Sequence, residues 1–545
     1  MSVQLKQGTS FMTLILILTA FGMAGMALAL FQMRAQPKGL YILFFAEMWE
    51  RFSFYGMRGL LVFYLTQHFL FSRDAAYGIY GAYTTLVYIM PVLGGLLADR
   101  LLGQRRAVLV GAILLVAGHG LMAVEGEPVA QGASPDELIL NTFYMALALI
   151  IMGVGFLKAN ISAIVGELYP KTDKRRDSAF TFFYVGINSG AFLGATWAGY
   201  LGQTVGWKYG FGLAGIGMLL GLVVFVWGKP LLKGAGEAPN EALLANKSFA
   251  GLPNQWLVYI GTFLATIVVW WMVRDQDTVG LILGFFGLIT VGYILYRSVF
   301  TLGAHARDRI FAALFLIIVQ ILFWALFEQA GSSLNIYTDE QVDRTAFGQE
   351  VPASVFQSLN ALYIIYLGPV FAALWVFLAK RGMDLSAPAK FGLGIIQLGL
   401  GYLVLVWGAN TAGVGNLTPV IFIFLIYLLH TTGELCLSPV GLSAMTRLSV
   451  KSMVGLIMGT WFLASAAGNF AASLIAQATV APGADVLEIY TRYGWIAVGV
   501  GVGLIVISPL VKYLMHLNTL EDDAPLAGAG EIGEPMASGV NPPKA

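Results

Sequence analysis

The sequence predicts an all-α integral membrane protein with about fourteen spanning helices, and three observations support this fold class. Hydrophobic residues occupy 58% of the 545 positions. Only 11% of the residues are charged, whereas a soluble domain carries roughly 25%. Apolar runs of about 20 residues, the length that crosses a bilayer, recur along the chain. The chain therefore lacks the polar surface that it would need to face water on all sides.

The predicted spans follow one another from residue 38 to residue 516. They lie at 38–69, 78–98, 106–125, 140–166, 178–202, 208–228, 254–273, 278–296, 309–334, 355–379, 389–409, 418–446, 453–478 and 490–516.

Lys and Arg are divided unequally between alternate loops, which predicts the orientation of the chain. Eighteen lie in one set of loops, and only Arg73, Lys208, Arg274, Arg344 and Arg492 lie in the opposite set. Loops rich in Lys and Arg remain in the cytoplasm. We therefore expect a multi-pass protein of the cell inner (plasma) membrane whose carboxyl terminus is cytoplasmic. The polar tail at 518–545 is predicted to be disordered.

Two central spans interrupt an otherwise regular arrangement. The runs 254–273 and 278–296 follow a polar linker and carry no interior charge, as is typical of helices that face lipid. We assign the linker and these two extra helices to 229–308. Six spans then remain on each side, in an N-terminal bundle at 33–228 and a C-terminal bundle at 309–517.

The loop after the second span reads Gly94-Gly95-Leu96-Leu97-Ala98-Asp99-Arg100, followed by Gly103, Arg105 and Arg106. It resembles the loop signature of the major facilitator superfamily, and Lys380-Arg381-Gly382 is a weaker counterpart in the second half. This resemblance implies the major facilitator fold, a 6+6 helix pseudo-repeat with a substrate site near the bilayer midplane.

Residues 1–32 form an apolar extension that admits three interpretations. Translation starts at Met33, or the segment is an additional helix that places the amino terminus outside, or it is a cleaved secretory signal. The sequence leaves these alternatives open.

The first span contains an unusual concentration of charge. Glu47, Glu50, Arg51 and Arg58 recur at helical spacing and share one stripe with Tyr55. Each charge at the bilayer centre costs about 2.5–3.5 kcal/mol, so these side chains must face protein or water. The stripe is either a structural knot of salt bridges or part of a functional site.

Isolated charges in other spans favour a functional site. Lys158 lies in the fourth span, Glu328 in the first span of the C-terminal bundle and Glu434 in its fourth span. Together with the first span they give four carboxylates and three cations. If all converge on one cavity, desolvation favours a proton on the odd carboxylate. A cavity with cations on its N-terminal wall and carboxylates on its C-terminal wall suits a zwitterion.

The pattern Glu47-x-x-Glu50-Arg51-Phe52-x-x-Tyr55-Gly56 is similar to the signature of the proton-dependent oligopeptide transporter (POT/PTR) family of the major facilitator superfamily. The likeness extends over nearly the whole chain. It implies a proton-coupled symporter that imports di- and tripeptides by alternating access. Phe54 departs from the pattern by replacing the first tyrosine of a pair, which removes one hydroxyl from the expected substrate contacts.

The resemblance also implies a role for each site residue. Proton coupling would involve Glu47, Glu50, Arg51, Lys158 and Glu328, and Arg58 would act in gating. The peptide-binding residues would be Arg51, Phe54, Tyr55, Tyr88, Lys158, Asn188, Trp324, Asn360, Glu434, Ser438 and Trp461. Among these, Arg51 and Lys158 would bind the peptide carboxylate and Glu434 the amine. Ordinary helix packing is the alternative for Tyr88 and Trp461.

Two other function classes are alternatives to a peptide transporter. A carrier of another small solute, such as a drug or nitrate, is the alternative within transport, and a membrane-embedded enzyme or receptor is the alternative outside it. No catalytic constellation is evident, so we expect no enzyme, cofactor or metal site. A single cysteine, Cys436, excludes an intramolecular disulfide, and the net charge of +1 argues against nucleic acid as a partner. The expected partners are small peptides, protons and the lipid bilayer; the oligomeric state is not predicted.

Overall fold

The computed structural model is almost entirely helical, which confirms the predicted fold class, and it describes residues 2–170, 173, 175–346 and 349–517. Within this part of the chain, twelve helices are long and apolar enough to cross a membrane. Two further predicted spans are helical but more polar, because α2 (Lys38–Phe63) carries four interior charges and α6 (Arg175–Thr204) is rich in Gly, Ser and Thr. The total of fourteen stays a prediction, and the predicted tail at 518–545 lies outside the described residues.

Six helices form the N-terminal bundle. They are α2, α3 (Arg73–Leu97), α4 (Gln104–Met122), α5 (Glu137–Glu167), α6 and α7 (Trp207–Gly228). Helix α2 packs against α6 and α7, α4 packs against α5 and α7, and α3 packs against α5.

Six helices of the C-terminal bundle repeat this arrangement. They are α11 (Ala304–Phe327), α13 (Ser358–Lys380), α14 (Ala387–Ala412), α15 (Ile421–Leu448), α16 (Val454–Ala478) and α17 (Val486–Leu514). The pairs α11–α16, α14–α15 and α14–α17 correspond to α2–α6, α4–α5 and α4–α7. This is the predicted 6+6 pseudo-repeat. The exact domain boundaries stay predictions.

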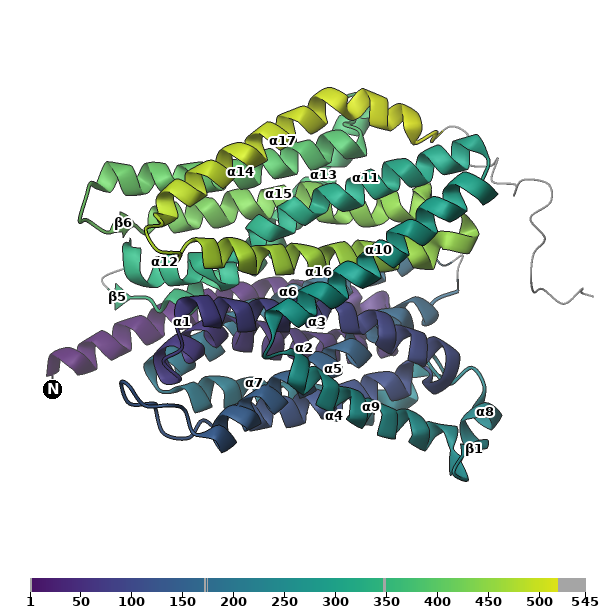
Figure 1. Ribbon diagram of the computed structural model, residues 1–545, viewed down its shortest axis with the longest axis horizontal. Helices are drawn as coiled ribbons and strands as arrows, with labels where there is room; N and C mark the ends of the chain where they lie inside the picture. Colours follow the sequence, from purple (N-terminus) through teal and green to yellow (C-terminus); the bar gives the residue numbers. More distant parts are fainter. Residues whose placement is uncertain (1, 171–172, 174, 347–348, 518–545) are drawn as a thin grey trace, which may run out of the picture.

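The bundles meet along two seams, α3 with α16 and α6 with α13. Figure 1 shows the C-terminal bundle above the N-terminal bundle, with α16 next to the boundary between them. Helix α9 (Asn254–Met272) packs on α5, and α10 (Gln276–Thr301) packs on α3 and α16. Both extra helices expose large apolar side chains, including Phe263, Leu281 and Leu288, as lipid-facing helices do. Helix α1 (Ser2–Gln32) packs along α6. It also contacts α13, where the Tyr366 hydroxyl donates a hydrogen bond to the Phe21 carbonyl oxygen at 2.9 Å.

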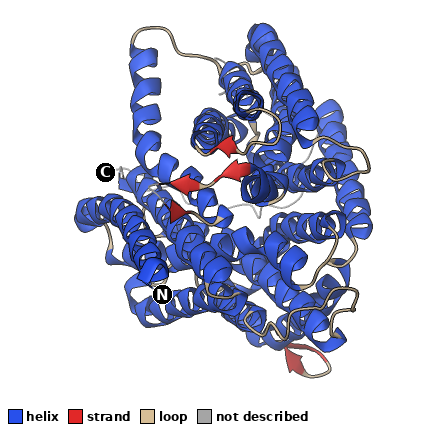
Figure 2. Cartoon of the chain, turned by 90° about the vertical axis from the view of Figure 1, so that its left-hand side faces the viewer, coloured by secondary structure: helices blue, strands red, loops and turns tan. Residues whose placement is uncertain are grey.

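Short elements mark the two ends of the bundles. One end, named the basic end here, carries the loops around Arg105, Lys229 and Lys380, with α8 (Glu241–Ala245) and the antiparallel strands β1 (Lys247–Phe249) and β2 (Leu252–Pro253). The opposite end carries α12 (Ser333–Gln341), the parallel pair β3 (Val342–Asp343) and β6 (Thr418–Pro419), and the antiparallel pair β4 (Thr345–Ala346) and β5 (Gln349–Glu350). Figure 2 views the molecule from this opposite end, where the strands lie near its middle.

Small residues let α2 and α6 approach backbone to backbone. A Cβ atom added at Gly190 would overlap the Met48 carbonyl oxygen, and one added at Gly194 would overlap the Phe52 carbonyl oxygen. One turn further, a Cβ on Gly56 would lie 2.8 Å from the Cβ of Ala198. Small residues spaced four apart are a common basis of close helix packing in membranes. This contact fixes the rotation of α2 and therefore the direction of its charged stripe.

We predict that Gly194→Leu destabilises the protein, because the new side chain has no room against α2. Overpacking of this kind costs about 1–3 kcal/mol or more. Thermal unfolding of the purified protein in detergent should show a lower Tm than wild type. Gly284→Leu on α10 is the control, because its added Cβ meets nothing within 4 Å and the Tm should not change. An unchanged Tm for Gly194→Leu would contradict the close packing of α2 and α6.

Candidate functional site

The charged stripe of α2 is buried and built around Arg51. Its Nε atom lies 2.8 Å from Glu47 Oε1 and 3.0 Å from Glu50 Oε2. All three residues are nearly inaccessible, at 6% exposed or less. Glu47 Oε2 and Glu50 Oε1 have no hydrogen-bond partner among the described residues. One guanidinium thus serves two carboxylates, and the group has a negative charge that a proton or another cation can neutralise.

Lys158 lies beside this group on α5 without pairing with it. Its Nζ atom lies 4.1 Å from the centroid of the Tyr88 ring, within the range of a cation–π interaction. None of the described carboxylates lies within ion-pair distance of Nζ, although Glu50 and Glu47 are close enough to act on its charge. The Lys158 ammonium group therefore lies where it can leave the Tyr88 ring and pair with a carboxylate.

Arg58 joins the two bundles. It forms a buried ion pair with Glu328, in the 3₁₀ turn that follows α11, and its Nε donates to the Tyr80 hydroxyl at 2.8 Å. A buried pair is costly to break on one side, because the remaining charge is left uncompensated. The pair ties α2 and α3 of one bundle to the other bundle.

Glu434 is the acidic group of the C-terminal wall. Asn360 on α13 donates from Nδ2 to Glu434 Oε2 at 2.9 Å and to Thr431 Oγ1 at 3.1 Å. Glu434 makes no ion pair with a described residue. The seven predicted charges therefore divide into the Arg51 group with Lys158 nearby, the Arg58–Glu328 pair, and Glu434 with an amide partner.

A pocket between the bundles brings residues of both walls together. It is lined by Tyr55, Arg58, Tyr88, Trp324, Phe327, Glu328, Ala330, Gln357, Asn360, Tyr427, His430 and Glu434. Seven of the predicted site residues are among them: Tyr55, Arg58, Tyr88, Trp324, Glu328, Asn360 and Glu434.

The other predicted residues lie around this pocket rather than in its lining. Phe54 is buried with its ring edge-to-face against Tyr55. The Asn188 amide donates to the Tyr184 carbonyl oxygen at 2.9 Å within α6. Ser438 is half-buried one turn beyond Glu434. Trp461 packs against Phe391 inside the C-terminal bundle, with ring centroids 6.3 Å apart. Arg51 and Lys158 lie on the N-terminal side, and the roles of all these residues stay predictions.

Sequence reasoning missed two polar residues of the pocket, Gln357 and Tyr427. Gln357 precedes Asn360 by three residues, and Tyr427 precedes Glu434 by seven. Residues at these spacings share a helix face. A search for polar residues one or two turns from each intramembrane carboxylate or amide would have found both.

Contacts between the bundles gather on the side of the pocket toward the opposite end. The Asn335 amide donates to the Gly59 carbonyl oxygen at 3.1 Å, and the Ser354 hydroxyl donates to Gln203 Oε1 at 2.6 Å. Toward the basic end, Ala159 and Ala163, one turn apart on α5, are exposed beside Lys158. The bundles are thus joined on the opposite-end side of the pocket, and α5 is exposed beside Lys158 toward the basic end.

Two pseudo-symmetric bundles that enclose a charged pocket and are joined on one side of it define a membrane transporter of the alternating-access type. Residues 105–496 match the model of the POT family. A peptide transporter of Yersinia enterocolitica is 34% identical over 481 residues, which cover 83% of this chain and 89% of that protein. A dipeptide and tripeptide permease A of Citrobacter koseri is 32% identical over 494 residues, covering 90% and 94%.

Two solved transporter structures resemble the fold of this chain. A crystal structure of a peptide transporter in complex with alafosfalin superposes with a TM-score of 0.76 at 35% identity, covering 88% of this chain and 96% of that one. A POT family transporter in complex with a thioalcohol-conjugated peptide gives a TM-score of 0.75 at 29% identity, covering 87% and 96%. The chain belongs to the POT family of the major facilitator superfamily.

We predict that Arg58→Met lowers the Tm more than the double variant Arg58→Met with Glu328→Met. The single change leaves a buried carboxylate unpaired, which costs about 3–5 kcal/mol, whereas the double change leaves no charge. Thermal unfolding of both variants and of Glu328→Met completes the double-mutant cycle. Additive losses would show that the two side chains do not interact.

Proposed function

We propose that this protein is a proton-coupled symporter that imports di- and tripeptides by alternating access between its two bundles. The observation that carries the proposal is the pocket whose C-terminal wall presents Glu434 while Arg51 and Lys158 lie on the N-terminal side. A short peptide is a zwitterion, and its two ends need opposite charges at a fixed separation. The names of its relatives, peptide transporters and di- and tripeptide permeases, support the same substrate class.

Each end of the peptide has a chemically suitable partner. Arg51 presents a planar fork of donors that matches a carboxylate, and Lys158 adds a second cation. Glu434 accepts from the ammonium group. Asn188 and Asn360 donate to and accept from the peptide backbone. Tyr55 and Tyr88 line the cavity, and Trp324, Trp461 and Phe54 provide apolar walls for different side chains, with Ser438 as a further polar contact.

Protonation and peptide binding favour the same state of the Arg51 group. With both carboxylates ionised, Glu47 and Glu50 hold Arg51. A proton on Glu50 weakens that hold and frees the guanidinium for the peptide carboxylate. Two ligands that stabilise the same state are thermodynamically coupled. Glu328 extends the coupling to the gate, because it pairs with Arg58 across the bundles.

The membrane potential provides sufficient driving force. One charge that crosses 100 mV releases about 2.3 kcal/mol, and about 1.4 kcal/mol corresponds to a tenfold ratio, so one proton per peptide sustains roughly forty-fold accumulation. For import, we assign the basic end and the carboxyl terminus to the cytoplasmic side of the inner membrane, in accord with the positive-inside rule. The exposed surface of α5 beside Lys158 then faces the cytoplasm.

The direct test is uptake of labelled dialanine by proteoliposomes. An inward proton gradient should drive accumulation above the external concentration, and a proton-conducting uncoupler should abolish it. Uptake that is indifferent to the gradient would refute proton coupling, and absence of uptake and of binding for a series of small peptides would refute the substrate class.

We predict that Glu434→Gln weakens the binding of free dipeptides at least tenfold, because the ammonium group loses its ionic partner. N-acetylated dipeptides, which carry no amine, should bind the variant and the wild type equally. Competition against a labelled dipeptide measures both. Cys436→Ala is the control, since its sulfur faces Gln397. Equal losses for free and acetylated peptides would contradict the assignment of Glu434.

Glu50→Gln separates exchange from proton-driven transport. Gln imitates a permanently protonated Glu but carries no titratable proton. The variant should still exchange labelled for unlabelled peptide across a membrane without a gradient, while its uptake driven by an imposed pH difference falls to background. The exposed Glu137→Gln, at the start of α5, should retain both activities. Full proton-driven accumulation by Glu50→Gln would place the proton elsewhere.

A further inference from the structure

A second pocket, of about 410 Å³, lies inside the C-terminal bundle at the basic end. It is formed by α13, α14, α15 and the end of α17, and none of its lining residues comes from the N-terminal bundle. The peptide pathway proposed above runs between the bundles. This pocket is therefore separate from it, and the role of its side chains needs its own explanation.

The shape of the pocket follows from the course of α13. Beyond Gly368 and Pro369, α13 exposes most of its side chains, and Phe371 and Trp375 remain half-buried because they face the pocket. On α15, the small side chains of Ser443 and Ala444 leave space where a larger residue would pack against them. The result is a space between helices at the depth where spanning segments end.

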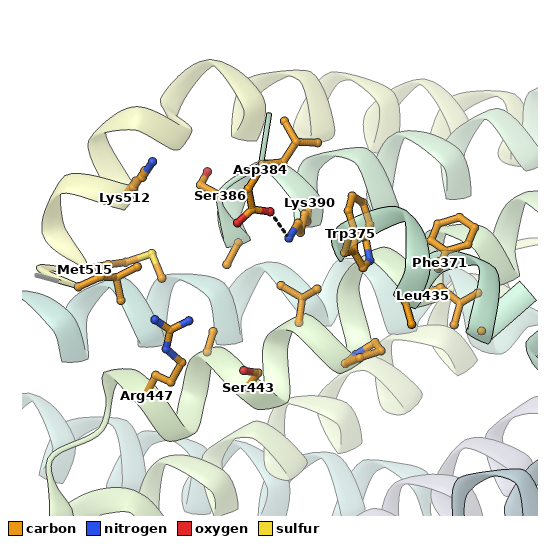
Figure 3. A pocket seen from close by; sticks show the side chains of 18 residues that line it. Phe371, Trp375, Asp384, Ser386, Lys390, Leu435, Ser443, Arg447, Lys512 and Met515 are labelled. Atoms are coloured by element: carbon orange, nitrogen blue, oxygen red, sulfur yellow. Dashed lines mark hydrogen bonds and ion pairs between the residues drawn. The ribbon is translucent and has the colours of Figure 1, made fainter. Parts of the chain in front are cut away.

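The charges of the pocket are predominantly positive. Lys390 Nζ lies 2.9 Å from Asp384 Oδ1 and 4.6 Å from the centroid of the Trp375 ring. Arg447 and Lys512 are exposed, and neither forms an ion pair with a described carboxylate. Figure 3 shows these two cations with Met515 at one end of the pocket, and Trp375 and Phe371 at the other. Three cations against one carboxylate leave a site that attracts an anion.

The apolar wall shows which kind of anion fits. Phe371 and Leu435 line the end of the pocket that lies away from Arg447 and Lys512 (Figure 3). A free phosphate or another soluble anion has no apolar part that could contact this wall. An anionic phospholipid has both parts in the right order, with a phosphate at the membrane surface and acyl chains extending into the bilayer. Basic pockets between helices on the cytoplasmic side are known to recognise such headgroups.

We propose that this pocket binds one anionic phospholipid, with its phosphate at the end of the pocket that carries Arg447 and Lys512 and an acyl chain along Phe371 and Leu435. Trp375 lies near the end of α13, which ends at Lys380, and indole rings near the ends of spanning helices commonly anchor them to the membrane interface. Lys390 is already satisfied by Asp384 and shapes the wall of the site. Arg447 and Lys512 have no such partner among the described residues, so the lipid phosphate provides the counter-charge.

Native mass spectrometry of the full-length protein tests the proposal. The purified protein is equilibrated with an equimolar mixture of phosphatidylglycerol and phosphatidylcholine, and the retained lipids are counted. The wild type should retain phosphatidylglycerol preferentially, and Arg447→Gln with Lys512→Gln should reduce that occupancy at least fivefold. The control is Lys229→Gln with Lys247→Gln, which removes two exposed basic-end cations outside the pocket and should leave occupancy unchanged.

Two further measurements distinguish a bound phospholipid from other occupants of the pocket. Ser443→Trp fills the pocket while retaining every charge, and it should also abolish retention. Millimolar glycerol 3-phosphate should not displace the lipid, whereas displacement by it would indicate a soluble phosphate site and overturn the proposal. Equal retention of the two lipids by the wild type, or phosphatidylglycerol adducts that appear only after removal of 518–545, would overturn it as well.

Discussion

The buried contact of the Arg51 guanidinium with Glu47 and Glu50 is the interaction on which this structure depends. Three charges within one turn of a membrane-spanning helix are tolerated only because they neutralise one another and are enclosed by protein. Their sum is not neutral, so the group needs a proton or a second cation. Lys158 is close enough to act as this second cation, but its ammonium group lies over the Tyr88 ring. The group is thus one positive charge short of neutrality, and in the proposed mechanism this deficit couples a proton to the substrate carboxylate.

The packing of α2 links the charges around Arg51 to the contact between the two bundles. Gly190 and Gly194 bring α6 onto the backbone of α2 and fix the direction in which Arg51 points. Seven residues further along α2, Arg58 pairs with Glu328 of the other bundle. Helix α2 therefore carries both the charge deficit and one of the contacts between the bundles. In the proposed mechanism, a change in the Arg51 group reaches the Arg58–Glu328 pair through this helix.

Much of the fold and part of the site could be predicted from the sequence, because intramembrane charges stand out against apolar helices. Glu47, Glu50 and Arg51 are also local, and helical spacing alone places them together. Partners distant in the chain could not be assigned in this way: Arg58 and Glu328 are 270 residues apart. The four interior charges of α2 lower its apolar character, but its apolar residues still predicted a span at 38–69. Gln357 was missed because an uncharged side chain does not stand out in a span, whereas the burial of Trp461 against Phe391 depends on the tertiary packing of α14 and α16.

Proton movement driven by peptide tests the central claim most directly. Proteoliposomes containing the wild-type protein and a trapped pH-sensitive dye are held without a pH difference, and their membrane potential is clamped at zero. An inward gradient of dialanine should acidify the lumen, and N-acetylated dialanine at the same concentration should produce a much weaker response. Entry of labelled dialanine without acidification would show that peptide and proton are not coupled, and that the charge deficit around Arg51 has no role in transport.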